Sequence, residues 1–171
     1  LGGGQQSAVE RVPPRAIIDQ LTNLYNQGKL EVVVEQAQKL TAQYTESAAL
    51  WNLTGASAIQ IGQLDLAIVA FQQVLAIKPN TPEAYSNMGV ALKDQGKLDE
   101  AIESCNKAIS IKPDNPDAYN NIGLALTEQG KVEEAMAAYN KALAIQPDYA
   151  KAYNNMGNAL KRQGKLEEAI E

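Results

Sequence analysis

The sequence predicts an all-α protein in which antiparallel helix pairs stack into a right-handed superhelix. Three observations support this prediction. Aromatic residues, glycines, alanines and prolines recur at a strict step of 34 residues, which indicates a repeat architecture. Within each repeat, two stretches carry apolar residues at the 3.6-residue spacing of a helix. Glycine lies between the two stretches and proline follows the second, so each repeat is expected to be a helix, a turn and a second helix.

Three sets of equivalent positions define the repeat. The aromatic set is Trp51, Tyr85, Tyr119 and Tyr153. The glycines expected inside the first helix are Gly55, Gly89, Gly123 and Gly157. The glycines expected to end that helix are Gly62, Gly96, Gly130 and Gly164. A glycine inside a helix costs roughly 1 kcal/mol relative to alanine, so its recurrence predicts that the two helices approach closely there.

Aligning the chain on this period predicts units at 14–47, 48–81, 82–115, 116–149 and 150–171. Residues 1–13 show no periodicity and are expected to be a flexible lead-in. The first unit is atypical, with Leu21 at a glycine position, as expected of a terminal repeat with one unpaired face. The fifth unit should end inside its second helix, after a turn at Gly164. It is therefore expected to bury its apolar residues poorly and to belong to a longer natural protein.

Composition excludes several classes of function. The net charge is −5 and no basic run is present, so nucleic-acid binding is not expected. Histidine is absent and Cys105 is the single cysteine, which argues against metal sites, cofactors and an internal disulfide. No apolar run is long enough for a membrane span and no signal peptide is visible. We therefore expect a non-enzymatic, cytoplasmic protein.

The remaining reactive residue types have structural interpretations. Cys105 occupies the position of Phe71 and Tyr139 in neighbouring units, so it is expected to be a buried thiol. Acidic residues such as Asp99 and Glu133 fall at the starts of second helices, where solvated carboxylates suit the helix dipole.

The segment "AYSNMGVALKDQGKLDEAIESCNKAISIKPDNP" (84–116) resembles the tetratricopeptide repeat (TPR) family almost throughout. The resemblance extends strongly over 48–171 and more weakly over 14–47. It implies a superhelix whose concave side is lined by the first helix of each pair and binds protein or peptide partners.

One polar pattern falls on the expected concave side. Asn87, Asn121 and Asn155, called here the asparagine ladder, each follow the repeated tyrosine by two residues. A side-chain amide offers donors and an acceptor that match a peptide backbone. The alternative is that these asparagines only bridge neighbouring helices or lie on a solvated face.

The ladder resembles that of the TPR domain of O-linked N-acetylglucosamine transferase, where asparagines in "YSNLG"-like segments bind a peptide backbone. The resemblance implies a peptide groove. Further candidates are polar neighbours, apolar residues one turn on, and a basic residue of a mixed-charge rim: Asn120, Asn154, Asn158, Val90, Leu124 and Lys161. Chaperone-cochaperone TPR domains hold a C-terminal carboxylate with five residues, of which only Asn121 and Lys151 find a match here. That clamp is not predicted.

Three functions remain open from the sequence. The first is a scaffold that binds a partner peptide or protein in the concave groove. The second is a homo-oligomer formed by end-to-end stacking of repeats. The third is the substrate-recognition arm of a larger transferase, because the segment before "LWNLTG" resembles the opening of bacterial TPR proteins, some of which carry such a domain downstream.

Overall fold

The computed structural model describes residues 12–168, which form helices and turns with no strand. Of the expected lead-in, residues 1–11 lie outside the described residues. The helices of the described part are α1 (Arg15–Asn26), α2 (Leu30–Gln43), α3 (Ala48–Gln60), α4 (Leu64–Ile77), α5 (Pro82–Asp94), α6 (Leu98–Ile111), α7 (Pro116–Glu128), α8 (Val132–Ile145) and α9 (Ala150–Glu168). The all-α repeat superhelix that the sequence predicts is confirmed.

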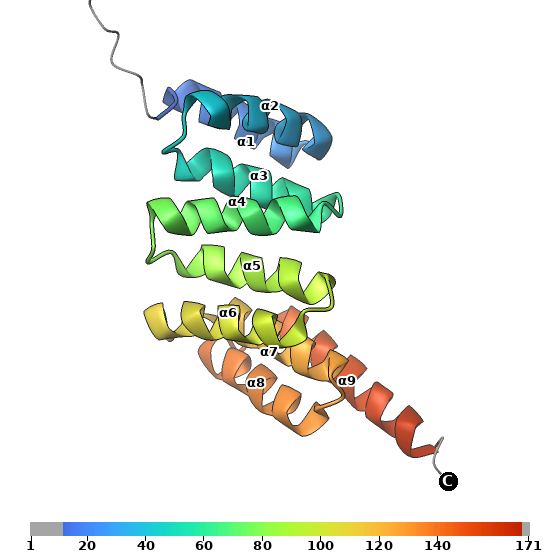
Figure 1. The fold of residues 1–171 in the computed structure, drawn as a ribbon. Coiled ribbons are helices and arrows are strands. Elements are labelled where there is room, and N and C mark those ends of the chain that lie inside the picture. Colours follow the sequence, from blue (N-terminus) through green and yellow to red (C-terminus); the bar gives the residue numbers. More distant parts are fainter. Residues whose placement is uncertain (1–11, 169–171) are drawn as a thin grey trace, which may run out of the picture.

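The helices stack in chain order along the length of the molecule (Figure 1). Each helix packs against the next one in sequence. The odd-numbered helices also contact each other, from α1 to α3 and onward to α9, whereas the even-numbered helices of the described chain touch only their sequence neighbours. The odd-numbered helices are therefore closer together, which places them on the inner, concave side of the superhelix.

Glycine ends the first helix in four units. Gly28, Gly62, Gly96 and Gly130 have φ between 73° and 78°, a region that side chains disfavour. The following residue then donates its backbone N–H back into the helix, as Lys97 does to the Leu92 carbonyl at 2.9 Å. This turn reverses the chain and lets the second helix pack against the first.

The glycines inside the first helices lie under large side chains of the second helices. A Cβ at Gly55 would fall less than 3.0 Å from the Phe71 ring, and one at Gly123 would fall closer still to the Tyr139 ring. At Gly89 the neighbour is the Cys105 thiol. The predicted close approach of the paired helices is therefore confirmed in these three units.

The fifth unit departs from the expected helix pair. Gly164 does not take a positive φ, and α9 continues through it as one helix to Glu168. The earlier second helices are 14 residues long, but only residues 165–171 follow Gly164 in this sequence. So short a second helix would bury little, whereas continued helix keeps its backbone hydrogen bonds.

The outer side of α9 is consequently uncovered. Tyr153 is 56% exposed and Leu160 is 50% exposed, and nothing lies within 4 Å of a Cβ added at Gly157. The poor burial expected of the last unit is thus seen in the side chains of α9.

Candidate functional site

An open groove of about 750 Å³ lies across α5, α7 and α9 on the concave side. It is lined by Glu83, Ser86, Asn87, Val90, Lys112, Asn115, Pro116, Asp117, Asn120, Asn121, Leu124, Tyr149, Lys151, Asn154 and Asn155. Most of these residues come from first helices, since those helices form the inner layer. Asparagine is the most frequent residue of the lining, so amides are its commonest polar side chains.

The asparagine ladder lies in this groove. Asn87 on α5, Asn121 on α7 and Asn155 on α9 all line it, and all three are partly buried. They occupy the same helical phase because each follows its aromatic residue by two positions. Asn87 and Asn121 make no side-chain hydrogen bond within the described part of the chain, so their amides are available to a ligand.

Asn155 differs from the other two members of the ladder. Its Nδ2 donates to Asn120 Oδ1 at 2.9 Å, which joins α9 to α7. Asn120 is only 4% exposed, so it holds the Asn155 amide from below while still reaching the groove. The bridging role that the sequence left open as an alternative therefore occurs at this one junction.

Ser86 occupies the position of Asn120 one repeat earlier. It is 5% exposed and lines the groove, and its Oγ has no hydrogen-bond partner among the described residues. Buried hydroxyl groups normally have a partner. Ser86 is not among the candidate residues predicted from the sequence, although it stands in register with Asn120.

The other predicted residues divide into two groups. Val90, Leu124 and Asn154 line the groove, and the first two are partly buried and add apolar surface. Asn158 and Lys161 are exposed on α9 and are not part of the groove lining. The structure therefore gathers seven of the nine candidates: Asn87, Asn121, Asn155, Asn120, Asn154, Val90 and Leu124.

Charges of both signs border the groove. Glu83, Asp117, Lys112 and Lys151 are all exposed in its lining. The Tyr149 hydroxyl donates to Asp117 Oδ1. Burial, reinforced by this hydrogen bond to a carboxylate, raises the pKa of Tyr149 above its usual value. The two lysines make no ion pair within the described residues, so they remain available to a partner's carboxylates.

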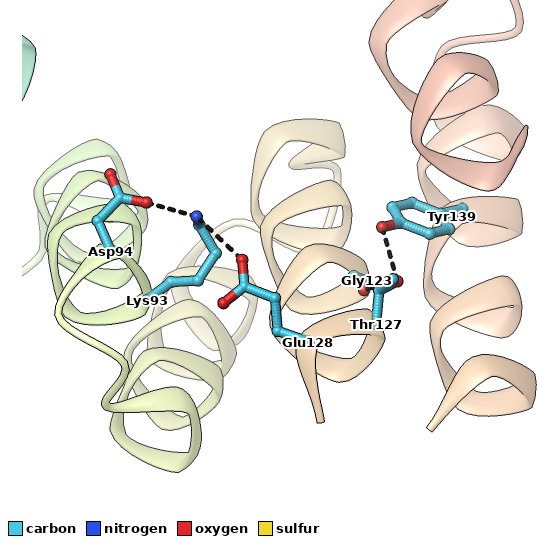
Figure 2. Close-up of polar contacts among 6 residues, drawn as sticks. All are labelled: Lys93, Asp94, Gly123, Thr127, Glu128 and Tyr139. Carbon is cyan, nitrogen blue, oxygen red and sulfur yellow. Dashed lines mark hydrogen bonds and ion pairs between the residues drawn. The ribbon is translucent and has the colours of Figure 1, made fainter. Parts of the chain in front are cut away.

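A separate ion cluster joins α5 to α7 beside the groove. Lys93 contacts Asp94 and also Glu128, with 3.4 Å between Lys93 Nζ and Glu128 Oε1 (Figure 2). Burial by itself lowers the pKa of Lys93, but the two carboxylates outweigh burial and the net shift is upward. Lys93 is therefore already paired within the protein.

Two linked hydrogen bonds are buried between α7 and α8. Thr127 donates to the Gly123 carbonyl at 2.8 Å, and the Tyr139 hydroxyl lies 3.1 Å from Thr127 Oγ1 (Figure 2). The Tyr139 hydroxyl is thereby satisfied although the residue is fully buried. This contact fixes the helix pair beneath the groove and leaves Tyr139 out of it.

Cys105 is a core residue, as predicted. It is 1% exposed, and burial raises the pKa of its thiol to about 12. A thiol that stays protonated is a poor nucleophile. Among the described residues, no cluster of histidine, cysteine or carboxylates could hold a metal ion.

A side-chain contact that was not predicted from the sequence repeats between units. Gln95 Nε2 donates to Asp65 Oδ1 at 2.6 Å, and Gln129 Nε2 donates to Asp99 Oδ1 at 2.7 Å. Each contact links the end of a first helix to the start of the preceding second helix. The carboxylates expected to be merely solvated therefore also join neighbouring units. The glutamine that precedes each turn glycine was the available signal.

No helix in the described part of the chain has the length and apolar character needed to cross a membrane.

Comparison with solved structures finds TPR proteins. The crystal structure of MamA is 23% identical, with a TM-score of 0.73 and 88% of each chain covered. The first TPR domain of human RPAP3 is 24% identical, with a TM-score of 0.66, and the match covers 71% of this chain and 95% of that domain. A structure described as the first TPR of Spaghetti (RPAP3) bound to the HSP90 peptide SRMEEVD is 24% identical, with a TM-score of 0.63 and coverage of 68% and 93%.

The sequence itself matches a family model. A model described as TPR repeat matches residues 55–96, 91–130 and 123–164, which together span more than half of the chain. No curated protein sequence matches. The family that the repeated motifs resemble is therefore confirmed, and this chain belongs to the tetratricopeptide repeat family.

Proposed function

We propose that this protein is a scaffold that binds an extended segment of a partner protein in the groove across α5, α7 and α9. The observation that carries the proposal is the set of amides in the groove, where Asn87 and Asn121 keep unpaired side chains in equivalent positions. An extended peptide exposes backbone N–H and C=O groups along its length, and amide side chains can pair with both.

Two further features support a peptide ligand. Val90 and Leu124 add apolar surface within the same groove, which contributes affinity by burial. The RPAP3 domain, which shares this fold, binds a peptide, as its description states. The resemblance of the ladder to that of O-linked N-acetylglucosamine transferase adds the expectation that backbone groups, more than side chains, are recognised.

Recognition of a terminal carboxylate is not part of the proposal. A carboxylate needs fixed cations around it. In this groove three positions of such a clamp hold other residue types. Ser86, Val90 and Asn155 stand where the clamp needs Lys, Asn and Arg. Lys151 is the cation that matches this clamp, and it is exposed on the rim of the groove.

To test the proposal, a decapeptide that binds the native chain is first selected from a library of random displayed peptides. Its affinity for variants of the groove is then measured. The selected peptide should bind the triple variant Asn87→Ala, Asn121→Ala, Asn155→Ala at least about tenfold more weakly, because several hydrogen bonds are lost together. The matched control replaces three exposed asparagines on other surfaces, Asn23→Ala, Asn106→Ala and Asn140→Ala. Equal affinity of both triple variants, at unchanged helicity, contradicts the proposal.

A second candidate function follows from the uncovered side of α9. Tyr153 is 56% exposed there and Leu160 is 50% exposed. A second copy of the chain that covers these two side chains would give end-to-end assembly. Analytical ultracentrifugation over a hundredfold concentration range tests this idea. A strict monomer at the highest concentration excludes assembly.

A further inference from the structure

Two neighbouring junctions of the groove differ in one residue. Between α7 and α9, Asn120 accepts a hydrogen bond from Asn155. Between α5 and α7, Ser86 and Asn121 stand 35 residues apart in the same register, but their side chains make no hydrogen bond to each other or to another described residue. The shorter serine side chain leaves the Asn121 amide unpaired.

This difference separates an occupied junction from an open one. The Asn155 amide has already given one donor to Asn120, so part of its hydrogen-bonding capacity is used within the protein. Asn121 keeps both donors and its acceptor. Ser86 lines the groove and is 5% exposed, and its hydroxyl is buried without a partner among the described residues. A buried hydroxyl without a partner is a cost that a ligand can remove.

We propose that Ser86 and Asn121 are the principal backbone-binding pair of the groove, and that they, rather than Asn120 and Asn155, determine the affinity for an extended peptide. This inference rests on the proposed function, since it assigns that function to one junction. It also limits the partner segment, because the residue bound at this junction must supply its own backbone N–H.

The hydrogen-bonding pattern of an extended chain fits this pair. In a β-like segment, the N–H and C=O of one residue point to the same side. The Asn121 amide can therefore accept from the N–H and donate to the C=O of a single residue. The Ser86 hydroxyl then donates to a carbonyl oxygen nearby. Both contacts use backbone atoms, so the junction tolerates many side chains but excludes proline, which lacks the N–H.

Reciprocal substitutions between the two junctions test the proposal. The variant Ser86→Asn places at the open junction the residue that pairs with Asn155 at the other, so it should occupy the Asn121 amide. The reverse variant, Asn120→Ser, should remove this partner from Asn155 and leave the Asn155 amide unpaired. The third variant, Ser86→Ala, removes only the hydroxyl. Asn120 shows that the backbone accepts an asparagine at this register, and circular dichroism and thermal melting check that each variant folds.

The probe is the decapeptide selected from the random library on the native chain, and its Kd is measured by isothermal titration calorimetry. Ser86→Asn and Ser86→Ala should each weaken binding about three- to tenfold, whereas Asn120→Ser should leave it unchanged or tighten it. Proline is then placed at each position of the peptide in turn, and it should abolish binding at the position that Asn121 contacts. That position is identified with the variant Asn121→Ala, whose affinity should not depend on whether proline stands there.

Three results overturn the proposal. They are unchanged or tighter binding by Ser86→Ala, unchanged binding by Ser86→Asn, and a loss in Asn120→Ser as large as that in Ser86→Asn. Failure of the proposed function gives a different result. In that case no peptide is selected, or the triple asparagine variant binds as well as the native chain.

Discussion

Leu21 and Ala37 lie together in the core of the first helix pair, where they reverse the sizes found in the next pair. Leu21 is 1% exposed on α1 and Ala37 is fully buried on α2. One repeat later, Gly55 on α3 lies under Phe71 on α4. The large side chain has moved from the second helix to the first, so the pair still fills its interior with a leucine at the glycine position.

This exchange predicts a strong coupling between the two positions. Ala37→Phe alone should overpack the pair and destabilise it by about 1–3 kcal/mol, and Leu21→Gly alone should leave a cavity and cost about 3–5 kcal/mol. The double variant reproduces the arrangement of Gly55 and Phe71. Urea unfolding should find it at least about 1 kcal/mol more stable than the sum of the single effects. Additive effects would show that the two side chains do not share one space.

The glycines under aromatic rings predict opposite effects of the same substitution. Gly123→Ala should destabilise the protein by about 1–3 kcal/mol, because its Cβ would meet the Tyr139 ring at 2.7 Å or less. Gly157→Ala is the matched control, since no atom lies within 4 Å of its added Cβ. It should be neutral or stabilise α9 by about 0.5–1 kcal/mol. The two variants are compared by their midpoints of thermal unfolding, measured by circular dichroism. If Gly157→Ala lowers the midpoint, the conclusion that nothing packs against α9 at Gly157 is contradicted.

Much of this architecture could be predicted from the sequence. The period of 34 located the helix pairs, and Cys105 was correctly assigned to the core from its register with Phe71 and Tyr139. The turn expected at Gly164 was wrong, because a glycine permits a positive φ without imposing it. The turn forms only where a full second helix follows and packs.

The groove was less accessible to sequence reasoning. Register placed Asn87, Asn121 and Asn155 on one face, but it could not show that Asn155 alone is bonded to Asn120. That contact depends on side-chain length at the junction, which is why Ser86 was not among the predicted candidates. Asn158 was predicted from its register with Val90 and Leu124, and Lys161 as part of a mixed-charge rim. Both are exposed on α9 and lie outside the groove lining.

Burial of Cys105 predicts a loss of stability at alkaline pH. In the unfolded chain this thiol ionises near its ordinary pKa of 9.0, whereas in the folded chain it stays protonated up to about 12. Its contribution is therefore complete below pH 9 and is lost as the pH rises from 9 toward 12. At pH 10.5 the loss should be about 1–2 kcal/mol relative to pH 7.5.

The control for this prediction is Cys105→Ala, measured by urea unfolding under reducing conditions. The variant is expected to be less stable than the native chain at pH 7.5, because it leaves a small cavity. The gap between the two proteins should narrow by the same 1–2 kcal/mol (about 5- to 30-fold in the folding equilibrium) at pH 10.5. A gap that is constant with pH rules out the linkage.

The contact between Gln129 and Asp99 predicts a measurable coupling between units. Each single substitution to alanine should destabilise the protein, and the double-mutant cycle should give a coupling of about 0.5–1 kcal/mol, the low end for a hydrogen bond to a charged but exposed carboxylate. The exposed Gln73 on α4 provides a neutral control. A coupling below about 0.2 kcal/mol would mean that the contact contributes nothing to stacking.

The most direct test of the central claim is a two-dimensional ¹H–¹⁵N NMR titration of the chain with the selected decapeptide. Binding in the groove predicts that the side-chain amide signals of Asn87 and Asn121 shift together with backbone signals of α5, α7 and α9. Signals of α6 and α8 should stay in place. Shifts confined to the surface around Tyr153 and Leu160, with silent ladder amides, would contradict the account.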